Sequence, residues 1–398
     1  MLPGTGMTSR VLGIGLIAAA MLACEGPDRG PDALHRSRGE PRSDSLEPPE
    51  AHRSLVLDRV LAGGDESDGL SFGLVRHLAV ETSGSIVVED AMGRAVVRLG
   101  PRGELRDSLG RSGPGPGEYR SPYGVAALPE GHVAVRDNRP PSIIIFDSLG
   151  GFVREWPLVD RVRFAEGLDV EMSAARDGLI RLLVPTSRSA DMYDLPQYRF
   201  VALTPTGQVV DSVSPLDPSQ ETGVRGEYQP RIHLAWHPAG FPVVGSSEAY
   251  HIELRRPDGA VTIERHSEPI PVTEEEKEAD RVVREWQRAR GAVDLETRPA
   301  PPDFKAAFAR ILVAETGEIW VFRHGMGERW GTRDLGNGLA YPRFREPVEA
   351  DVFDAEGRFI QTVRGAASID PKVIRGDTVW AVLTGAQEEH YVARYLVR

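Results

Sequence analysis

Two short stretches of the chain have residue types and spacings that could carry out chemistry. The stretch GLSFG at residues 69–73 fits the G-x-S-x-G pattern of a nucleophilic serine, and residues 110–124 (GRSGPGPGEYRSPYG) are as rich in glycine as a phosphate-binding loop. A nucleophile elbow needs a strand before its serine and a helix after it. A phosphate loop needs a lysine and a helix whose first N–H groups meet the phosphates.

Neither stretch has these surroundings. The polar residues 63–68 (GGDESD) precede the first stretch, and a strand pattern follows it. In the second, Gly117 is followed by Glu118 and Tyr119, no lysine is near, and again a strand pattern follows. We therefore interpret 69–73 as a chance match and 110–124 as a joint between two pieces of sheet.

The remaining motifs predict neither adhesion nor metal binding. The tripeptide RGD at 375–377 falls where a hairpin turn needs Gly376 for its backbone conformation. The ten histidines include no H-E-x-x-H or similar ligand spacing. His77, Glu171 and His233 fall on strands that we expect to be innermost, but no acidic residue or histidine matches them in the other repeats. We predict no catalytic residue, metal or cofactor.

The N-terminus has the pattern of an export signal. Residues 11–23 (VLGIGLIAAAMLA) are thirteen apolar residues that follow Arg10 and precede Cys24, the single cysteine. This run is too short to span a bilayer and has the length of a signal peptide's apolar part. Met21–Cys24 resembles the bacterial lipobox, in which the cysteine is lipidated. We expect a lipoprotein signal peptide over 1–23 and a lipid on Cys24; an ordinary signal peptide beside a chance cysteine is the alternative.

The composition of the next residues predicts a tether. Residues 24–53 are rich in Pro, Arg, Asp, Glu and Ser, so they cannot bury enough surface to fold. We assign 54–398 to one folded domain, held at the cell envelope on the periplasmic side or at the outer membrane. The formal net charge of −12 is unlike that of a nucleic-acid binder. The expected partners are the membrane, through the anchor, and a protein or small-molecule ligand.

From residue 54 onward a unit of short apolar runs and glycine turns repeats. First turns fall at Gly84, Gly131, Gly178, Gly240, Gly317 and Gly376, and second turns at Gly103, Gly150, Gly207, Gly259 and Gly357. Three copies keep the same interval between their two turns, which is typical of a repeated four-stranded hairpin unit.

The strand count predicts a closed ring. Five copies supply four strands each, whereas the sixth supplies three, near 371–375, 378–384 and 389–396. Residues 54–61 (SLVLDRVL) are an apolar strand outside the repeats. We predict an all-β fold, a six-bladed β-propeller whose last blade is completed by this N-terminal strand, which removes an exposed edge. An open β-solenoid and another number of blades are the alternatives.

The joint and the blade after it resemble a known family. The stretch GPGEYRSPYGV, followed by EGHVAVRD and IIIFDSLGGFV, is similar to the NHL-repeat-like and TolB-like blades of bacterial six-bladed propeller proteins. The close sequence similarity covers about one blade and a joint. Since NHL-like propellers include metal-dependent enzymes, it also implies an alternative function, a hydrolase or lyase with a metal in the central channel.

Residues 273–290 interrupt the β pattern with apolar residues at helical spacing. Thr273 and Glu276 form a predicted capping box, and Asp280 and Arg284 are spaced for an ion pair. This helical insertion packs on the rim of the propeller or covers its channel.

The loop lengths predict where a ligand binds. Strands alternate in direction, so both sets of glycine turns lie on one face and all long connections on the other. The long connection 324–347 carries Trp330, Arg333 and Tyr341, residue types that anchor interfaces. We favour a membrane-anchored, non-catalytic binding or scaffold module, with these three residues as the candidate site.

Overall fold

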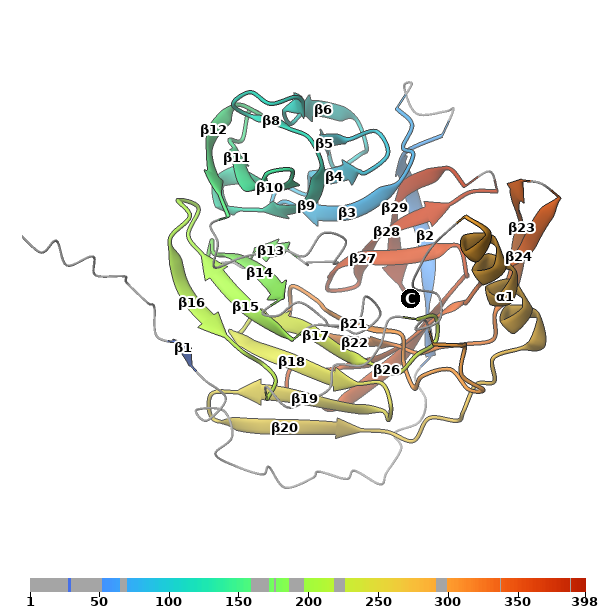
Figure 1. Ribbon diagram of the computed structural model, residues 1–398. Helices are drawn as coiled ribbons and strands as arrows, with labels where there is room; N and C mark the ends of the chain where they lie inside the picture. Colours follow the sequence, from blue (N-terminus) through green and yellow to red (C-terminus); the bar gives the residue numbers. More distant parts are fainter. Residues whose placement is uncertain are drawn as a thin grey trace, which may run out of the picture.

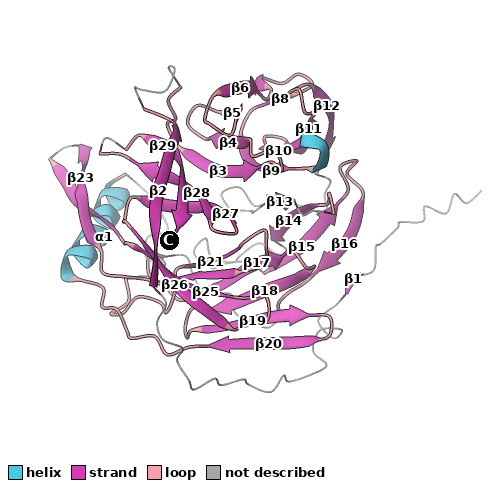
Figure 2. Cartoon of the chain, turned by 180° about the vertical axis from the view of Figure 1, so that it is seen from behind, coloured by secondary structure: helices cyan, strands magenta, loops and turns pink. Residues whose placement is uncertain are grey.

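The computed structural model is built almost entirely of β-strands, with one α-helix in the part that it describes (Figure 2). That part comprises residues 28–29, 52–64, 70–158, 172–174, 177–185, 197–217, 226–290, 299–336, 338–386 and 388–398. Residues 1–23, Cys24 and Glu171 lie outside it. Within the described ranges, no helix is long and apolar enough to cross a membrane.

Most strands belong to four-stranded antiparallel units in which chain neighbours pair (Figure 1). The first unit is β3 (Val75–Val80), β4 (Ile86–Asp90), β5 (Ala95–Leu99) and β6 (Leu105–Ser108). The second is β9 (Pro122–Ala127), β10 (Val133–Asn138), β11 (Pro141–Phe146) and β12 (Phe152–Pro157), with a 3-10 turn at Pro129–Gly131. The third is β13 (Met172–Ala174), β14 (Ile180–Pro185), β15 (Tyr198–Leu203) and β16 (Val209–Val213).

The second half of the chain repeats the pattern. The fourth unit is β17 (Ile232–His237), β18 (Phe241–Ser246), β19 (His251–Arg256) and β20 (Gly259–Glu264). The fifth is β21 (Arg310–Val313), β22 (Ile319–Phe322), β25 (Val348–Phe353) and β26 (Phe359–Gly365). The sixth is β27 (Ile369–Arg375), β28 (Thr378–Thr384) and β29 (His390–Val397), with β2 (His52–Ala62) beside β29. Short pairs are formed by β7 (Arg111–Ser112) with β8 (Glu118–Tyr119), and by β1 (Asp28–Arg29) with β16.

Glycines occupy the hairpin turns as the sequence predicts. All eleven have a positive φ: Gly84, Gly103, Gly131, Gly150, Gly178, Gly207, Gly240, Gly259, Gly317, Gly357 and Gly376. This conformation strains residues that have a Cβ. At Gly103 a Cβ would also overlap the backbone oxygen of Leu61 in β2. Both the turn and the close approach of the strand therefore require glycine there.

The glycine-rich stretch 110–124 is a joint between the first two units, as predicted. Tyr119 is buried, and its hydroxyl accepts a hydrogen bond of 2.9 Å from the backbone N–H of Val96 in the first unit. The Glu118 carboxylate accepts the N–H of Gly115 at 2.8 Å and pairs with Arg111 at 2.6 Å. Strand β9 follows the joint, so no helix N-terminus is present to hold a phosphate.

Both turn sets of a unit lie on one face, as one buried side chain demonstrates. The Arg98 guanidinium in β5 donates to the backbone oxygens of Gly131, Ser148 and Asp147, at 2.9 to 3.0 Å. Gly131 belongs to the first turn of the second unit, and the other two acceptors belong to its second turn. Because β10 and β11 run antiparallel, the connection between them emerges on the opposite face.

Apolar side chains fill the space between consecutive units. Clusters join the first unit to the second (Val87, Ile144), the second to the third (Ile145, Leu182), the fourth to the fifth (Ile252, Val321) and the fifth to the sixth (Val352, Val379). The rings of Phe200 and Trp236, 5.0 Å apart, join the third and fourth. In a further cluster, Val382 and Val392 of the sixth unit pack with Ile86 of the first.

Strand β2 lies against the last strand of the chain. It pairs antiparallel with β29, from Leu55 opposite Val397 to Ala62 opposite Val392. Its first residues also pair parallel with β26, His52 lying opposite Thr362. The N-terminal strand thus links the fifth and sixth units into one eight-stranded sheet.

Candidate functional site

The long connections of the fourth and fifth units build a helix–hairpin extension. It consists of α1 (Glu274–Ala289) and the two-stranded sheet of β23 (Glu328–Gly336) and β24 (Leu339–Arg345), which lie together at one side in Figures 1 and 2. The predicted capping box forms: Thr273 Oγ1 accepts the Glu276 N–H at 3.2 Å, and Glu276 accepts the Thr273 N–H at 2.8 Å. The predicted ion pair of Asp280 and Arg284 also forms.

The helix packs against β24, so it covers the hairpin. The Trp286 indole N–H donates to the backbone oxygen of Leu335 at 3.1 Å. Phe344 of β24 and Glu276 of α1 both lie against Gly327. The hairpin was not predicted, since residues 324–347 were expected to be a loop. The helix was expected to pack on the rim of the propeller or to cover its channel.

The structure brings the three predicted binding residues together on this hairpin. Arg333 lies opposite Tyr341 across the two strands, and Trp330 lies in a β-bulge of β23. Arg333 is exposed, whereas the other two side chains are half-buried. The Arg345 guanidinium stacks on the Trp330 ring, 4.1 Å from its centre.

Alternation along β24 decides which way the residues point. Tyr341, Arg343 and Arg345 share one face of the hairpin, opposite to the face of Phe344 and the helix. Arg343 forms an ion pair with Glu388 of the sixth unit. The face that carries the arginines and aromatic residues is therefore turned toward the β28–β29 connection.

A buried ionic network fixes the base of the extension. Lys305 Nζ lies 2.7 Å from Glu276 Oε1, 2.7 Å from Glu346 Oε1 and 3.0 Å from the Gly325 backbone oxygen, and its side chain is fully buried. The Tyr228 hydroxyl donates to Glu276 at 3.0 Å, and His324 Nδ1 lies 2.8 Å from Glu346. These contacts tie the first turn of α1 to the chain on either side of the hairpin.

The electrostatics of this network suit a structural anchor. Burial raises the pKa of Glu346, but His324 and Lys305 outweigh it and hold that pKa below its usual range. Lys305 likewise lowers the pKa of Glu276, although burial acts to raise it. Burial and the neighbouring carboxylates raise the pKa of Tyr228 far above its usual value. At neutral pH both glutamates are ionised and the tyrosine is protonated, so these three groups are fixed in charge.

Of the three innermost-strand residues named from the sequence, the structure describes His77 and His233, and each has a different partner. His77 Nδ1 lies 2.9 Å from Glu89, whereas His233 Nε2 lies 3.2 Å from the Ser247 hydroxyl. Burial lowers the pKa of His233 to about 3, so its imidazole is neutral. In the part of the chain that the structure describes, no three His, Cys, Asp or Glu side chains converge as a metal site would require.

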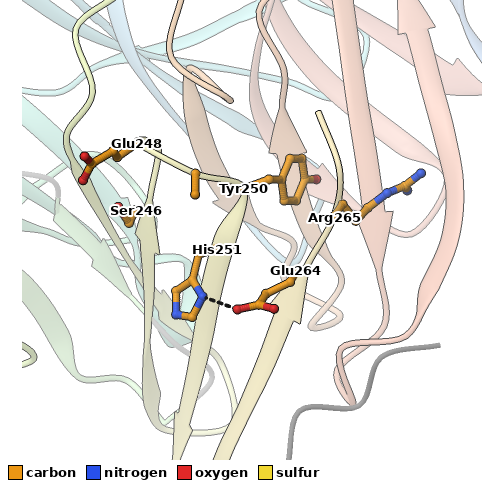
Figure 3. Close-up of a pocket in the computed structure, with 7 residues that line it drawn as sticks. Ser246, Glu248, Tyr250, His251, Glu264 and Arg265 are labelled. Carbon is orange, nitrogen blue, oxygen red and sulfur yellow. Dashed lines mark hydrogen bonds and ion pairs between the residues drawn. The ribbon is translucent and has the colours of Figure 1, made fainter. Parts of the chain in front are cut away.

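A pocket of about 470 Å³ lies at the edge of the fourth unit (Figure 3). Its lining includes Ser246, Glu248, Tyr250, His251, Glu264 and Arg265. His251 Nδ1 lies 2.9 Å from Glu264, and the Tyr250 hydroxyl donates to Asp351 at 2.9 Å. Of its lining side chains, His251 and Tyr250 thus already bond to protein carboxylates.

The sheets define a β-propeller protein. No family model matches the sequence, and no curated protein matches it either. Among solved structures, a member of the DUF4221 family from Bacteroides vulgatus is 10% identical, with 88% of this chain and 99% of that chain covered and a TM-score of 0.54. This similarity concerns the fold.

Two solved enzymes are similar to the chain with lower TM-scores. A gluconolactonase from Xanthomonas campestris is 14% identical over 88% of this chain and 99% of its own, with a TM-score of 0.40. A catalytically inactive virginiamycin B lyase from Staphylococcus aureus, solved with quinupristin, is 10% identical over 83% of each chain, with a TM-score of 0.42. The gluconolactonase and lyase activities are properties of those two proteins.

Proposed function

We propose that this chain is a membrane-anchored binding or scaffold module outside the cytoplasm. In this proposal it is a six-bladed propeller of the NHL-repeat-like and TolB-like kind, closed by β2 and lipidated on Cys24. Its helix–hairpin extension recognises a protein or small-molecule ligand.

The contacts between the last and first units support a closed ring. Arg375 in the sixth unit donates to the backbone oxygen of Val80 in the first at 3.1 Å, and the same guanidinium pairs with Glu315 of the fifth at 2.7 Å. The apolar cluster that holds Val382 and Ile86 crosses the same boundary. Since the other consecutive units pack in the same manner, closure leaves no unit with an open face.

The hairpin face opposite to α1 is the observation that carries the binding proposal. It presents Trp330, Arg333 and Tyr341 on a two-stranded sheet whose other face is covered by α1, and the Lys305 network holds its base. Tryptophan, tyrosine and arginine are enriched among the residues that contribute most to binding energy at interfaces, and a rigid support reduces the conformational entropy that is lost on binding.

An affinity-capture experiment tests this proposal. The full chain and the variant Trp330→Ala/Arg333→Ala/Tyr341→Ala are each used to capture partners from an envelope extract of the source cells. A partner bound by the parent and lost by the variant is then purified, and its affinity for both chains is measured. We expect at least a tenfold loss of affinity. The single variant Arg333→Ala should keep the parent's melting temperature, because an exposed substitution costs under about 0.5 kcal/mol, whereas alanine at the half-buried Trp330 and Tyr341 should lower it by several degrees at most.

The opposite face provides a matched control. Arg102, Leu149 and Arg358 lie at or beside the second turns of three units, and alanine at all three should leave binding unchanged. Equal affinity of parent and hairpin variant for the purified partner would place the site elsewhere. A large loss of stability in the hairpin variant would make the three residues structural.

A further inference from the structure

Large apolar side chains are exposed along the outer strands of the first three units. They share one position in the repeat, since each lies in the second turn of its unit or in the first two residues of the outer strand that follows. Their exposed fractions range from 38% for Val210 to 85% for Leu149. We call this set the apolar belt: Leu105 of β6, Leu149 and the β12 residues Phe152 and Val153, and the β16 residues Val209 and Val210.

Contacts between units bring the parts of the belt side by side. A Cβ at Gly150, in the second turn of the second unit, would lie 3.2 Å from Asp107 Cβ in β6. The Trp156 indole N–H in β12 donates to the Pro205 backbone oxygen, in the second turn of the third unit, at 3.3 Å. The outer strand of each unit therefore lies beside the second turn of the next. Single exposed apolar residues are ordinary, whereas a neighbouring group of large ones indicates contact with a partner or a membrane.

Strand β1 indicates which of these occupants the belt meets. It pairs parallel with the end of β16, Asp28 lying opposite Ser212. Because the two strands run in the same direction, the N-terminal end of β1 points toward the Val209 end of β16, which belongs to the belt. Cys24 precedes Asp28 by four residues, and four residues of fully extended chain reach at most about 14 Å. A lipid on Cys24 would therefore enter the membrane close to the third unit.

The helix–hairpin extension lies away from the belt. Figures 1 and 2 show β1 and β16 at one side of the molecule, and α1 with β23 and β24 at the other. In addition, β23 and β24 join β22 to β25 at the strand ends remote from the turns at Gly317 and Gly357, whereas the belt lies beside the corresponding turns of its own units. A membrane at the belt would therefore leave the extension free to reach a partner.

We infer that the apolar belt rests on the lipid bilayer, so that the anchored chain stands on its first three units. Apolar side chains that enter the boundary between headgroups and acyl chains leave water, and the gain grows with the apolar area buried. Acyl chains on one residue hold a protein at the membrane without orienting it, whereas contacts from three units select one orientation. This inference rests on the proposed function, since it requires the lipid on Cys24 and names the surface that the anchored chain turns to the membrane.

Fluorescent labels on introduced cysteines test the inference. The lipid occupies the thiol of Cys24, so a new cysteine is the one free thiol of the lipidated full chain. The variants Val153→Cys and Val210→Cys each carry a nitrobenzoxadiazole label and are bound to vesicles of phosphatidylethanolamine and phosphatidylglycerol. We expect lipids with a nitroxide near the headgroup to quench both labels roughly twofold or more, because side chains of an interfacial surface lie at that depth.

The fifth unit provides a matched control, Ile360→Cys. Ile360 is 42% exposed and is the second residue of β26, just as Val153 and Val210 are the second residues of β12 and β16. In the proposed ring the fifth unit lies opposite the second, so its label should remain unquenched. Equal quenching at Ile360 would show that the whole turn face lies on the bilayer, which overturns the assignment to the first three units.

The inference is also overturned if both belt labels on the vesicle-bound chain are unquenched by the nitroxide lipids. Belt labels that instead quench one another as the protein density rises would assign the belt to a second copy of the chain. Melting temperatures are measured alongside, and either belt variant decides the result if the other does not fold. A vesicle-bound parent with unquenched belt labels retains the proposed anchor and rejects the orientation. A parent that binds vesicles no better than Cys24→Ala rejects the anchor and the inference together.

Discussion

The guanidinium of Arg375 donates to the backbone oxygen of Val80 across 3.1 Å, although 295 residues separate the two in the chain. The same side chain pairs with Glu315 at 2.7 and 2.9 Å. One residue at a hairpin turn therefore connects the fifth, sixth and first units. Contacts of this kind, from a side chain in one unit to a turn of the next, also occur at Arg98 and at His237, whose Nε2 lies 2.9 Å from the Gly317 oxygen.

Replacing Arg375 with alanine should weaken the junction between the last and first units. Its hydrogen bonds involve a charged donor, and such bonds contribute about 1.5 to 3 kcal/mol each when their acceptors are buried. We expect the free energy of unfolding to fall by about 2 kcal/mol, measured by urea denaturation. Arg358→Ala, at an exposed turn, should change it by under about 0.5 kcal/mol. Equal values for the two variants would show that the Arg375 contacts do not stabilise the fold.

Removing residues 54–61 should destabilise the whole domain. The deletion exposes the edge of β29 and removes the contact of Leu61 with the turn at Gly103. Exposed apolar edges pair with other chains, so we expect aggregation or a much lower melting temperature. The milder variant Gly103→Ala, which forces the turn away from β2, should also lower the melting temperature. Unchanged melting curves for both variants would contradict closure by β2. Deleting residues 25–50 is the control and should have little effect.

The repeated units could be predicted because their signals are local. A short apolar run and a glycine turn determine a hairpin from neighbouring residues alone, and every predicted turn glycine has a positive φ. The capping box of α1 involves residues three positions apart, so it too could be predicted from the sequence. Closure of the ring was predicted only from the number of strands. The contacts that support it, such as that of Arg375 with Val80, join residues that are far apart in the sequence.

The hairpin of the extension was not predicted, because β23 has no alternating apolar pattern. Its sequence ERWGTRDLG is mostly polar and exposed, which is typical of a loop. The missed signal is the Gly-Asn-Gly stretch at 336–338, whose two glycines have positive φ values of 81° and 75°. The partners of Lys305 were also missed, since Glu276 and Glu346 lie 29 and 41 residues away from it.

The Lys305 network yields a prediction about stability. Lys305→Met leaves Glu276 and Glu346 without their shared cation in a buried site, and breaking a buried pair in this way costs about 3 to 5 kcal/mol. We expect a loss of this size by urea denaturation. The triple variant Lys305→Met/Glu276→Gln/Glu346→Gln removes the unpaired charges and should recover more than half of the loss. A loss below about 1 kcal/mol in the single variant would contradict the network's role.

Stability should also depend on pH through Glu253. Hydrogen bonding to His251 is the main cause that lowers the pKa of Glu253 to about 2, with Arg255 adding to it, whereas an unfolded chain's glutamate has a pKa of about 4.3. Because the folded pKa is the lower one, the contribution is present above pH 4.3 and is lost as the pH falls from about 4.3 to about 2. Urea midpoints across this range should fall less steeply for Glu253→Gln than for the parent. Glu274→Gln, at a highly exposed position, should follow the parent; a Glu253→Gln curve parallel to the parent's would contradict this contribution.

Cys24 should carry a lipid, because it directly follows the thirteen apolar residues 11–23 and is the single cysteine of the chain. A lone cysteine cannot form a disulfide within the chain, and anchoring accounts for its position. In the source cells, metabolic labelling with a fatty-acid probe should mark the parent and leave Cys24→Ala unmarked. Ser45→Ala, within the predicted tether, is the control and should be labelled as the parent is. Since one acyl chain binds membranes only marginally, stable recovery of the parent with the membrane fraction would further indicate more than one chain on the cysteine. Equal labelling of the parent and Cys24→Ala would show that the anchor is absent or lies elsewhere.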